Sequence, residues 1–251
     1  MLQKCIVFLL IGLPASASFV LVTPGGSVGF SACVYDSGGL PIPNQYVRWF
    51  ISAEPYSGFH SHNSPIRYPG TLMDAAGGTT DYNGCAYGTF QSTSVAGIHV
   101  LEAYAHTSSG TFMDVMYIYV IAHNPFLEGL PNYYVYQKVG VQPQHPSPFY
   151  GTFNTVYRIQ RICERFYQET GLVAGVNDIS LPWGGLFDLG PNYGGQWWGT
   201  PHIEHRWGLN ADMPYQYLGT TAQRTRFQEI AQEEGALVVP EGNHFHLRFP
   251  N

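Results

Sequence analysis

The stretch GTTDYNGCAYGTFQSTSVAGIHVLEAYA, residues 78–105, decides the fold of the first half of the chain. Its short runs of alternating apolar and polar residues are separated by turn signals such as Asn83-Gly84 and Ala96-Gly97. Similar runs precede it in residues 18–52 and follow it in residues 111–122. Strands this short, at this spacing, predict an all-β sandwich over residues 18–122.

Two segments of this region carry a family resemblance. VYDSGGLPIPNQYVRWF (34–50) followed by TTDYNGCAYGTFQSTSVAGIHVLEA (79–103) resembles the bacterial Ig-like domains of the invasin/intimin type. The shared residues mainly mark turns and strands, so the resemblance implies a fold rather than an activity. Cys33 and Cys85 lie in strand-like stretches and could form a disulfide that leaves Cys163 free, but their spacing does not decide the pairing.

The N-terminal segment MLQKCIVFLLIGLPASAS (1–18) predicts export. It has one basic residue, then an apolar run, then Ala15-Ser16-Ala17, which is the order of regions in a secretory signal. We therefore expect residues 1–17 to be a signal peptide and the protein to be secreted, periplasmic or on the cell surface. No later stretch is long and apolar enough to cross a membrane. The net charge of −6 argues against nucleic acid as a partner.

The pattern changes after residue 122, where a Pro- and Tyr-rich connector, residues 123–134, leads into a second domain, residues 135–251. Helical periodicity predicts helices over 152–171 and 220–235. The last residues, 236–249, predict two strands around a Pro-Glu-Gly-Asn turn. The expected architecture is therefore multidomain: an N-terminal Ig-like sandwich, then an α+β domain with a small antiparallel sheet.

Four histidines gather in two motifs near the C-terminus. PHIEHRWGLNAD (201–212) holds His202 and His205, and NHFHLR (243–248) holds His244 and His246. Side chains two apart on a strand point to the same face, so His244 and His246 should project into one space. Open zinc sites use three protein ligands drawn from His, Asp, Glu or Cys. The two motifs together therefore predict a metal site, with Asp212 as a further ligand.

HRWGLNAD followed at a distance by HFHLR resembles the penicillin-insensitive murein endopeptidases, and more broadly the superfamily that includes the D-alanyl-D-alanine metallopeptidases. The resemblance covers roughly residues 135–251. It implies one zinc ion per chain, held by His205, Asp212 and His246. It also implies that His244 faces the reaction as base or oxyanion partner. His202 matches a histidine that this family has three residues before its first ligand.

A second assignment stays open, because EGNH (241–244) also reads as the E-x-x-H form of the D-alanyl-D-alanine branch. In that branch Glu241 would be the base and His244 the ligand. Arg206 and Arg248 are expected to bind a carboxylate of the substrate, since guanidinium groups pair well with carboxylates. Trp207 could line a groove for glycan or peptide.

These features together predict an exported zinc metallopeptidase that hydrolyses amide bonds in peptidoglycan peptides, with zinc-bound water as the nucleophile. The Ig-like domain would act as a spacer or positioning module. Two alternatives remain: a metallopeptidase acting on another extracellular peptide or protein, and a non-catalytic adhesion protein with a structural metal. The oligomeric state is left open by the sequence.

Overall fold

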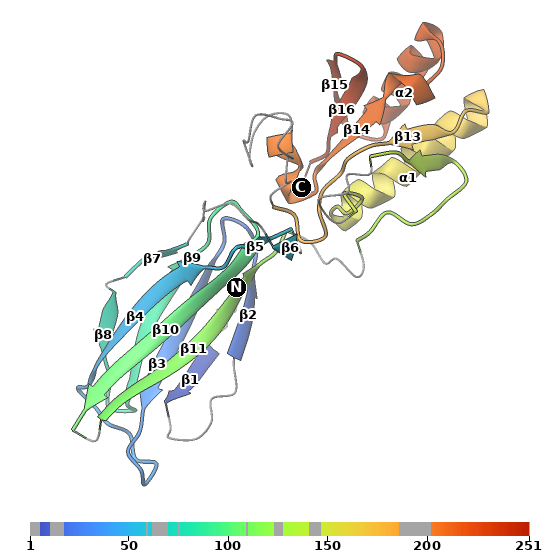
Figure 1. The fold of residues 1–251 in the computed structure, drawn as a ribbon. Helices are drawn as coiled ribbons and strands as arrows, with labels where there is room; N and C mark the ends of the chain where they lie inside the picture. Colours follow the sequence, from blue (N-terminus) through green and yellow to red (C-terminus); the bar gives the residue numbers. More distant parts are fainter. Residues whose placement is uncertain are drawn as a thin grey trace. The chain divides into compact units, whose positions relative to one another are not determined.

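The computed structural model describes most of the 251-residue chain, namely residues 6–10, 18–58, 60–61, 70–74, 76–108, 110–122, 128–140, 147–185 and 202–250. Within these ranges strands in several sheets dominate, accompanied by two α-helices (Figure 1). This confirms the prediction of a β-rich chain with few helices. The chain divides into two compact units: unit 1 is Met1–Tyr56 with Asn63–Ile121, and unit 2 is Ser57–His62 with Ala122–Asn251.

Unit 1 contains two larger sheets. The first has the order β1 (Ile6–Leu10), β3 (Ser27–Val34), β9 (Cys85–Gln91) and β7 (Thr71–Leu72). The second has the order β2 (Ser18–Val22), β11 (Gly110–Val120), β10 (Gly97–Thr107), β4 (Tyr46–Ala53) and β8 (Gly77–Thr79). The pairs β1–β3 and β2–β11 are parallel, and the other pairs are antiparallel. β1 lies within the segment predicted as a signal peptide, and export stays a prediction.

The two larger sheets share one hydrophobic core. On β4 the side chains alternate, with Val47 and Trp49 buried and Arg48 and Phe50 exposed. The Trp49 ring lies edge-on to the ring of Phe30, on β3 of the other sheet, with centroids 5.2 Å apart. The period-2 pattern seen in the sequence therefore turns apolar faces of both sheets toward each other.

The TDYNG turn has a specific physical basis. The Asp81 side chain accepts hydrogen bonds from the backbone N–H groups of Asn83 (2.9 Å) and Cys85 (3.0 Å). Gly84 has φ +77°, a left-handed conformation that costs a residue without Cβ little. These contacts form a turn that ends at Cys85, where β9 begins, and explain why this sequence pattern marks the start of a strand.

Cys33 and Cys85 form a disulfide in this structure, while Cys163 is a buried free thiol. The two bonded residues lie directly opposite each other on the neighbouring strands β3 and β9. The pairing that the sequence left open is thus set by strand register.

Removing this disulfide is expected to lower the free energy of unfolding of unit 1 by about 2–4 kcal/mol, because it closes a loop between residues 52 positions apart. The measurement is calorimetry of the wild type and of the Cys33→Ala, Cys85→Ala double variant. A reductant should lower the unfolding temperature of the wild type and leave the unfolding temperature of the variant unchanged. Equal stability of the oxidised wild type and the variant would contradict the prediction.

Unit 2 combines helices with small sheets. In chain order its elements are β12 (Tyr136–Lys138), α1 (Phe153–Thr170), β13 (Ala174–Val176), the 3-10 helix η2 (His202–Trp207), β14 (Asn210–Pro214), the 3-10 helix η3 (Tyr215–Tyr217), α2 (Thr221–Glu233), β15 (Leu237–Glu241) and β16 (His244–Arg248). β12 and β13 are parallel, and β14, β16 and β15 form an antiparallel sheet in that order. A further short pair is β5 (Tyr56–Ser57) with β6 (His60–Ser61).

Both predicted helices are present and capped as their sequences indicate. Thr152 caps α1 by accepting from the Thr155 N–H, and Gly171 ends it with φ +71°. Thr220 and Gln223 form a reciprocal capping box at the start of α2. The predicted apolar positions of α1 are all buried: Val156, Ile159, Cys163 and Phe166.

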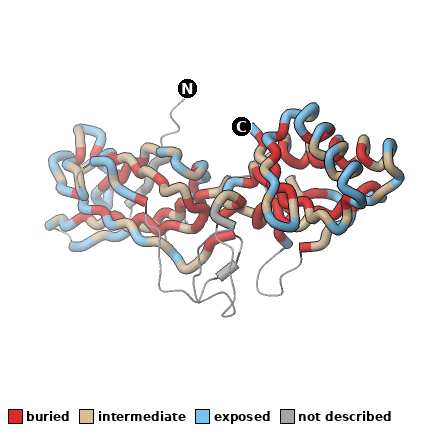
Figure 2. The backbone as a smooth tube through the Cα atoms, turned by 90° about the horizontal axis from the view of Figure 1, so that it is seen from above, coloured by how far each residue is buried: buried red, intermediate tan, exposed pale blue. Residues whose placement is uncertain are grey.

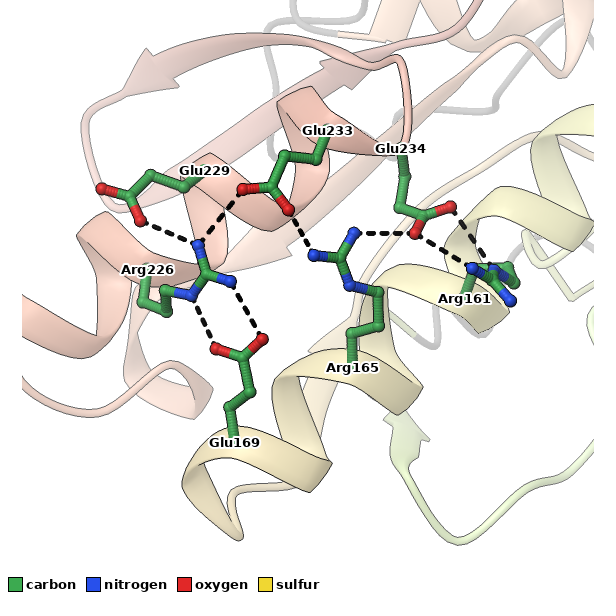
Figure 3. A network of polar contacts seen from close by, with 7 residues as sticks. All are labelled: Arg161, Arg165, Glu169, Arg226, Glu229, Glu233 and Glu234. Carbon is green, nitrogen blue, oxygen red and sulfur yellow. Dashed lines mark hydrogen bonds and ion pairs between the residues drawn. The ribbon is translucent and has the colours of Figure 1, made fainter.

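A network of charged side chains connects the exposed parts of α1 and α2 (Figure 3). Its members are Arg161, Arg165, Glu169, Arg226, Glu229, Glu233 and Glu234. Glu169 holds Arg226 in a bidentate pair, with Nε–Oε2 at 2.6 Å and Nη2–Oε1 at 2.9 Å. Exposed ion pairs contribute little individually, so the packing of α1 and α2 depends mainly on the apolar faces beneath them.

One face of β16 packs into the core of unit 2. Phe245 stacks nearly parallel to Phe227 of α2, with ring centroids 6.0 Å apart, and Leu247 is fully buried. Alternation along the strand sends His244, His246 and Arg248 to the opposite face. The core therefore fixes the direction in which the two histidines point.

Figure 2 shows buried residues alternating with exposed ones along both units. Among the described residues, no helix is both long enough and apolar enough to span a bilayer.

Candidate metal centre

The candidate site is built on the three-stranded sheet of unit 2. In the register of β14 and β16, Asp212 lies opposite His246 and Pro214 lies opposite His244. On the other side of β16, Glu241 of β15 lies opposite His244. Strand pairing thus brings residues from both predicted motifs to one place.

His205 reaches this sheet from η2. Its Nδ1 lies 2.8 Å from the backbone oxygen of Ile179 and must donate to it, because a carbonyl can only accept. Its Nε2 lies 3.4 Å from Asp212 Oδ2. The backbone contact therefore directs the second nitrogen of the imidazole toward Asp212, as outer contacts of metal-bound histidines do.

His205, Asp212 and His246 form a buried group that could hold a metal ion, with one ligand atom from each residue all within 4.8 Å of one another. His246 Nδ1 lies 2.8 Å from Asp212 Oδ1. Ligands around tetrahedral zinc are roughly 3.3 Å apart. The 3.4 Å between His205 Nε2 and Asp212 Oδ2 is close to that value, and two imidazoles with a carboxylate suit zinc.

The electrostatics of this group favour a cation. Burial acts to raise the pKa of Asp212, but hydrogen bonds from His205 and His246 outweigh it and hold that pKa below its usual range. Burial lowers the pKa of His205, but the hydrogen bond and charge of Asp212, with the charge of Asp178, outweigh this effect and raise it. Asp212 therefore carries its negative charge at neutral pH.

His244 and Glu241 lie beside the group. His244 Nε2 is 3.5 Å from Asp212 Oδ1 and 3.5 Å from Glu241 Oε2. The side chain of His244 is partly exposed and that of Glu241 more so, at 20% and 41%. His244 thus adjoins the buried group, and Glu241 adjoins His244.

Glu204 of η2 contacts two residues of β16. Its Oε2 lies 3.2 Å from His246 Nε2. Arg248 donates to both of its carboxylate oxygens, Nε to Oε2 at 2.7 Å and Nη2 to Oε1 at 2.9 Å. The hydrogen bond and charge of Arg248, with the charge of His246, lower the pKa of Glu204.

The other predicted site residues lie on η2. The Arg206 guanidinium is stacked on the Trp207 ring, 4.4 Å from its centroid, and 38% of Trp207 is exposed. His202 begins η2, and its side chain is outside the described part of the structure. Arg206 and Trp207 thus follow directly after His205, on the same element.

The sequence prediction missed Asp178, which is 3% exposed and acts electrostatically on His205 and Asp212. Its backbone oxygen accepts from the N–H of Asp212 (2.9 Å). Burial raises the pKa of Asp178 to about 7. The charge of His205 acts to lower this pKa, and the charge of Asp212 acts to raise it further. The signal in the sequence is a carboxylate inside the otherwise mainly apolar run AGVNDISL, 174–181.

No protein-family model and no curated protein matches the sequence. Among solved structures, a chaperone from Pseudomonas aeruginosa, CupB2, is similar with 9% identity and a TM-score of 0.29, over 42% of this chain and 53% of that one. A family 123 glycoside hydrolase from Clostridium perfringens is similar with 11% identity and a TM-score of 0.22, over 44% of this chain and 24% of that one. The chain thus spans about half of the first protein and a quarter of the second.

Proposed function

We propose that this protein is an exported zinc-dependent peptidase that hydrolyses amide bonds in the peptides of peptidoglycan. The observation that carries the proposal is the convergence of His205, Asp212 and His246, from two distant motifs, into one buried group with His244 and Glu241 beside it. The resemblance of both motifs to murein endopeptidases gives the substrate class. The Cys33–Cys85 disulfide agrees with an oxidising destination.

In the proposed site His205, Asp212 and His246 hold the zinc ion. Zinc supplies Lewis acidity, which polarises a carbonyl group and makes water a nucleophile near neutral pH. Asp212 contributes the negative charge, and the two imidazoles keep the net charge of the ligand set at −1. The burial of all three side chains excludes bulk water and strengthens their electrostatic interactions.

His244 is the proton-transfer residue of the proposal. Its Nε2 lies next to the ligand set, and its side chain is partly exposed, so a substrate can reach it. A positioned imidazole can take a proton from the attacking water and pass it to the leaving amine. Glu241, whose Oε2 lies 3.5 Å from the same nitrogen, orients the ring.

The substrate is proposed to lie along η2 and the face of β16 that carries His244 and His246. Arg206 and Trp207 offer a cation and an aromatic surface next to the ligand His205. His202 is the other predicted contact, whereas Arg248 is already paired with Glu204. Peptide stems carry carboxylates, which suits the guanidinium of Arg206.

Unit 1 is proposed to be an Ig-like module of the invasin/intimin type that positions the peptidase. Its two larger sheets around one core agree with that fold class. Its described structure includes no metal-ligand group like that of unit 2. Its contribution is therefore expected in substrate location rather than in chemistry.

The test is hydrolysis of murein by the purified protein with and without a chelator, with casein digested in parallel and the products identified by mass. We expect cleaved peptide stems, loss of activity with chelator and recovery with zinc. Cleavage of casein but not murein would assign another substrate. A protein that holds metal but cleaves neither would contradict a peptidase and favour an adhesion protein with a structural metal.

A further inference from the structure

Glu204 links two side chains of β16 that share one face of the strand. One oxygen, Oε2, contacts both His246 Nε2 (3.2 Å) and Arg248 Nε (2.7 Å). The other, Oε1, accepts from Arg248 Nη2 at 2.9 Å. The guanidinium of Arg248 therefore forms a bidentate pair with the carboxylate of Glu204, and the imidazole of His246, on the same strand as Arg248, contacts that carboxylate too.

The chemistry of these groups fixes the direction of each hydrogen bond. A guanidinium only donates, so the paired carboxylate of Glu204 only accepts. His246 Nε2 must then carry the hydrogen that it shares with Glu204. The other ring nitrogen, Nδ1, lies inside the ligand group and donates to Asp212 Oδ1, 2.8 Å away. A metal ion that binds Nδ1 would displace this hydrogen.

We infer that Glu204 and Arg248 form a clamp that fixes His246 as an Nδ1 metal ligand. The inference rests on the metal centre of the proposed function. Glu204 is a positioning residue, because it acts on the metal only through the imidazole. Arg248 acts one step further away, by holding the carboxylate of Glu204 in place, and this role replaces the substrate contact expected from the sequence.

The burial of the three residues supports this division of roles. The His246 side chain is 4% exposed, whereas those of Glu204 and Arg248 are 42% and 40% exposed. A partly exposed ion pair contributes little to stability on its own. Its main effect here is on the buried ring that it touches, since a carboxylate that accepts from a ligand histidine fixes the tautomer and raises the basicity of the ring.

The chain contains a matched control for this clamp. Glu169 holds Arg226 through the same four atoms, at 2.6 and 2.9 Å, with side chains 38% and 34% exposed. That pair lies in the network between α1 and α2, and no histidine belongs to that network (Figure 3). A purely structural effect of losing a Glu–Arg pair should therefore appear in both pairs.

The experiment measures the zinc dissociation constant by competition with a chromophoric chelator, on the full chain. Glu204→Gln is expected to weaken zinc binding about 10-fold to 100-fold, the usual effect of losing an outer partner of a ligand histidine. Glu169→Gln is expected to bind zinc like the wild type. Arg248→Ala should weaken binding by less, and the double variant Glu204→Gln with Arg248→Ala should be no weaker than Glu204→Gln alone.

The outcomes separate this inference from the proposed function. If the wild type binds zinc and the zinc dissociation constant of Glu204→Gln is within twofold of the wild-type value, the clamp alone is overturned. Arg248→Ala with unchanged zinc affinity and a raised KM overturns the role of Arg248 and restores the substrate contact. A wild type that binds no zinc overturns the metal centre and the clamp together. Zinc binding without murein hydrolysis overturns the proposed substrate, and the peptidase as well if casein is also left uncut. In both cases the zinc affinities of the variants still decide the clamp.

Discussion

Replacing His246 by alanine is expected to abolish stoichiometric zinc binding and murein hydrolysis together. His246 supplies one of three ligands, and its Nδ1 lies 2.8 Å from the second, Asp212. Since binding at a site of this kind is shared among few ligands, losing one should weaken zinc binding by at least about 10²-fold. Replacing His205 should have the same effect, because it supplies the third ligand.

The measurement is zinc content by metal analysis after dialysis, together with thermal unfolding with and without added zinc. At zinc concentrations about 100 times the dissociation constant, binding should stabilise the wild type by about 2.7 kcal/mol. The His246→Ala protein should show no such stabilisation. His106→Ala is the control, since His106 is exposed on β10 of unit 1, where its Nδ1 hydrogen-bonds the hydroxyl of Thr111.

Two results would contradict this prediction. One is a His246→Ala protein that still holds one zinc per chain, which would place the ligands elsewhere. The other is a wild type that holds no zinc while it hydrolyses murein. A circular dichroism spectrum equal to that of the wild type separates loss of metal from loss of fold.

The elements of unit 2 were largely predictable because their signals are local. The helices predicted over 152–171 and 220–235 are α1, between the caps Thr152 and Gly171, and α2, which starts at the cap Thr220. The period of the apolar residues gave the buried face of α1 for the same reason. Capping and periodicity act over one or two turns, so they can be read without the tertiary structure.

The location of the site was predictable for a different reason. Alternation on a strand guarantees that His244 and His246 share a face, whatever lies opposite. The strand register that places Asp212 opposite His246 depends on the tertiary structure. The resemblance to a known family named these two residues as ligands, whereas the residue pattern alone does not. For the same reason the sequence left open the disulfide between Cys33 and Cys85, which depends on the register of β3 and β9.

The contacts around the ligands were predictable only in part: Glu204, next to His205 in the sequence, is a candidate to orient a ligand imidazole, and it contacts His246. Asp178 approaches Asp212 through a backbone hydrogen bond between segments 34 residues apart, and no motif marks it. Arg248 was expected to face substrate, because an arginine beside two histidines reads as a free cation. The structure pairs it with Glu204, 44 residues away. Such partners depend on how η2 packs against β16, which local patterns do not encode.

Replacing His244 by glutamine is expected to leave zinc bound and to lower kcat about 10²-fold to 10⁴-fold. His244 lies outside the closest ligand group, yet its Nε2 is 3.5 Å from Asp212 Oδ1. Glutamine keeps a polar side chain but cannot transfer a proton near neutral pH. The fall should therefore appear in kcat, with the zinc dissociation constant unchanged.

Glu241→Gln provides the comparison that decides between the two assignments of base and ligand. If Glu241 only orients His244, its loss should cost on the order of tenfold in kcat and none of the zinc. If instead Glu241 is the base and His244 a ligand, Glu241→Gln should be the more damaging change and His244→Gln should lose zinc. The strand face makes both histidines available, and the grouping of buried His246 with His205 and Asp212, within 4.8 Å of one another, favours His246 as ligand. Steady-state kinetics and zinc content on the same two variants therefore assign both roles.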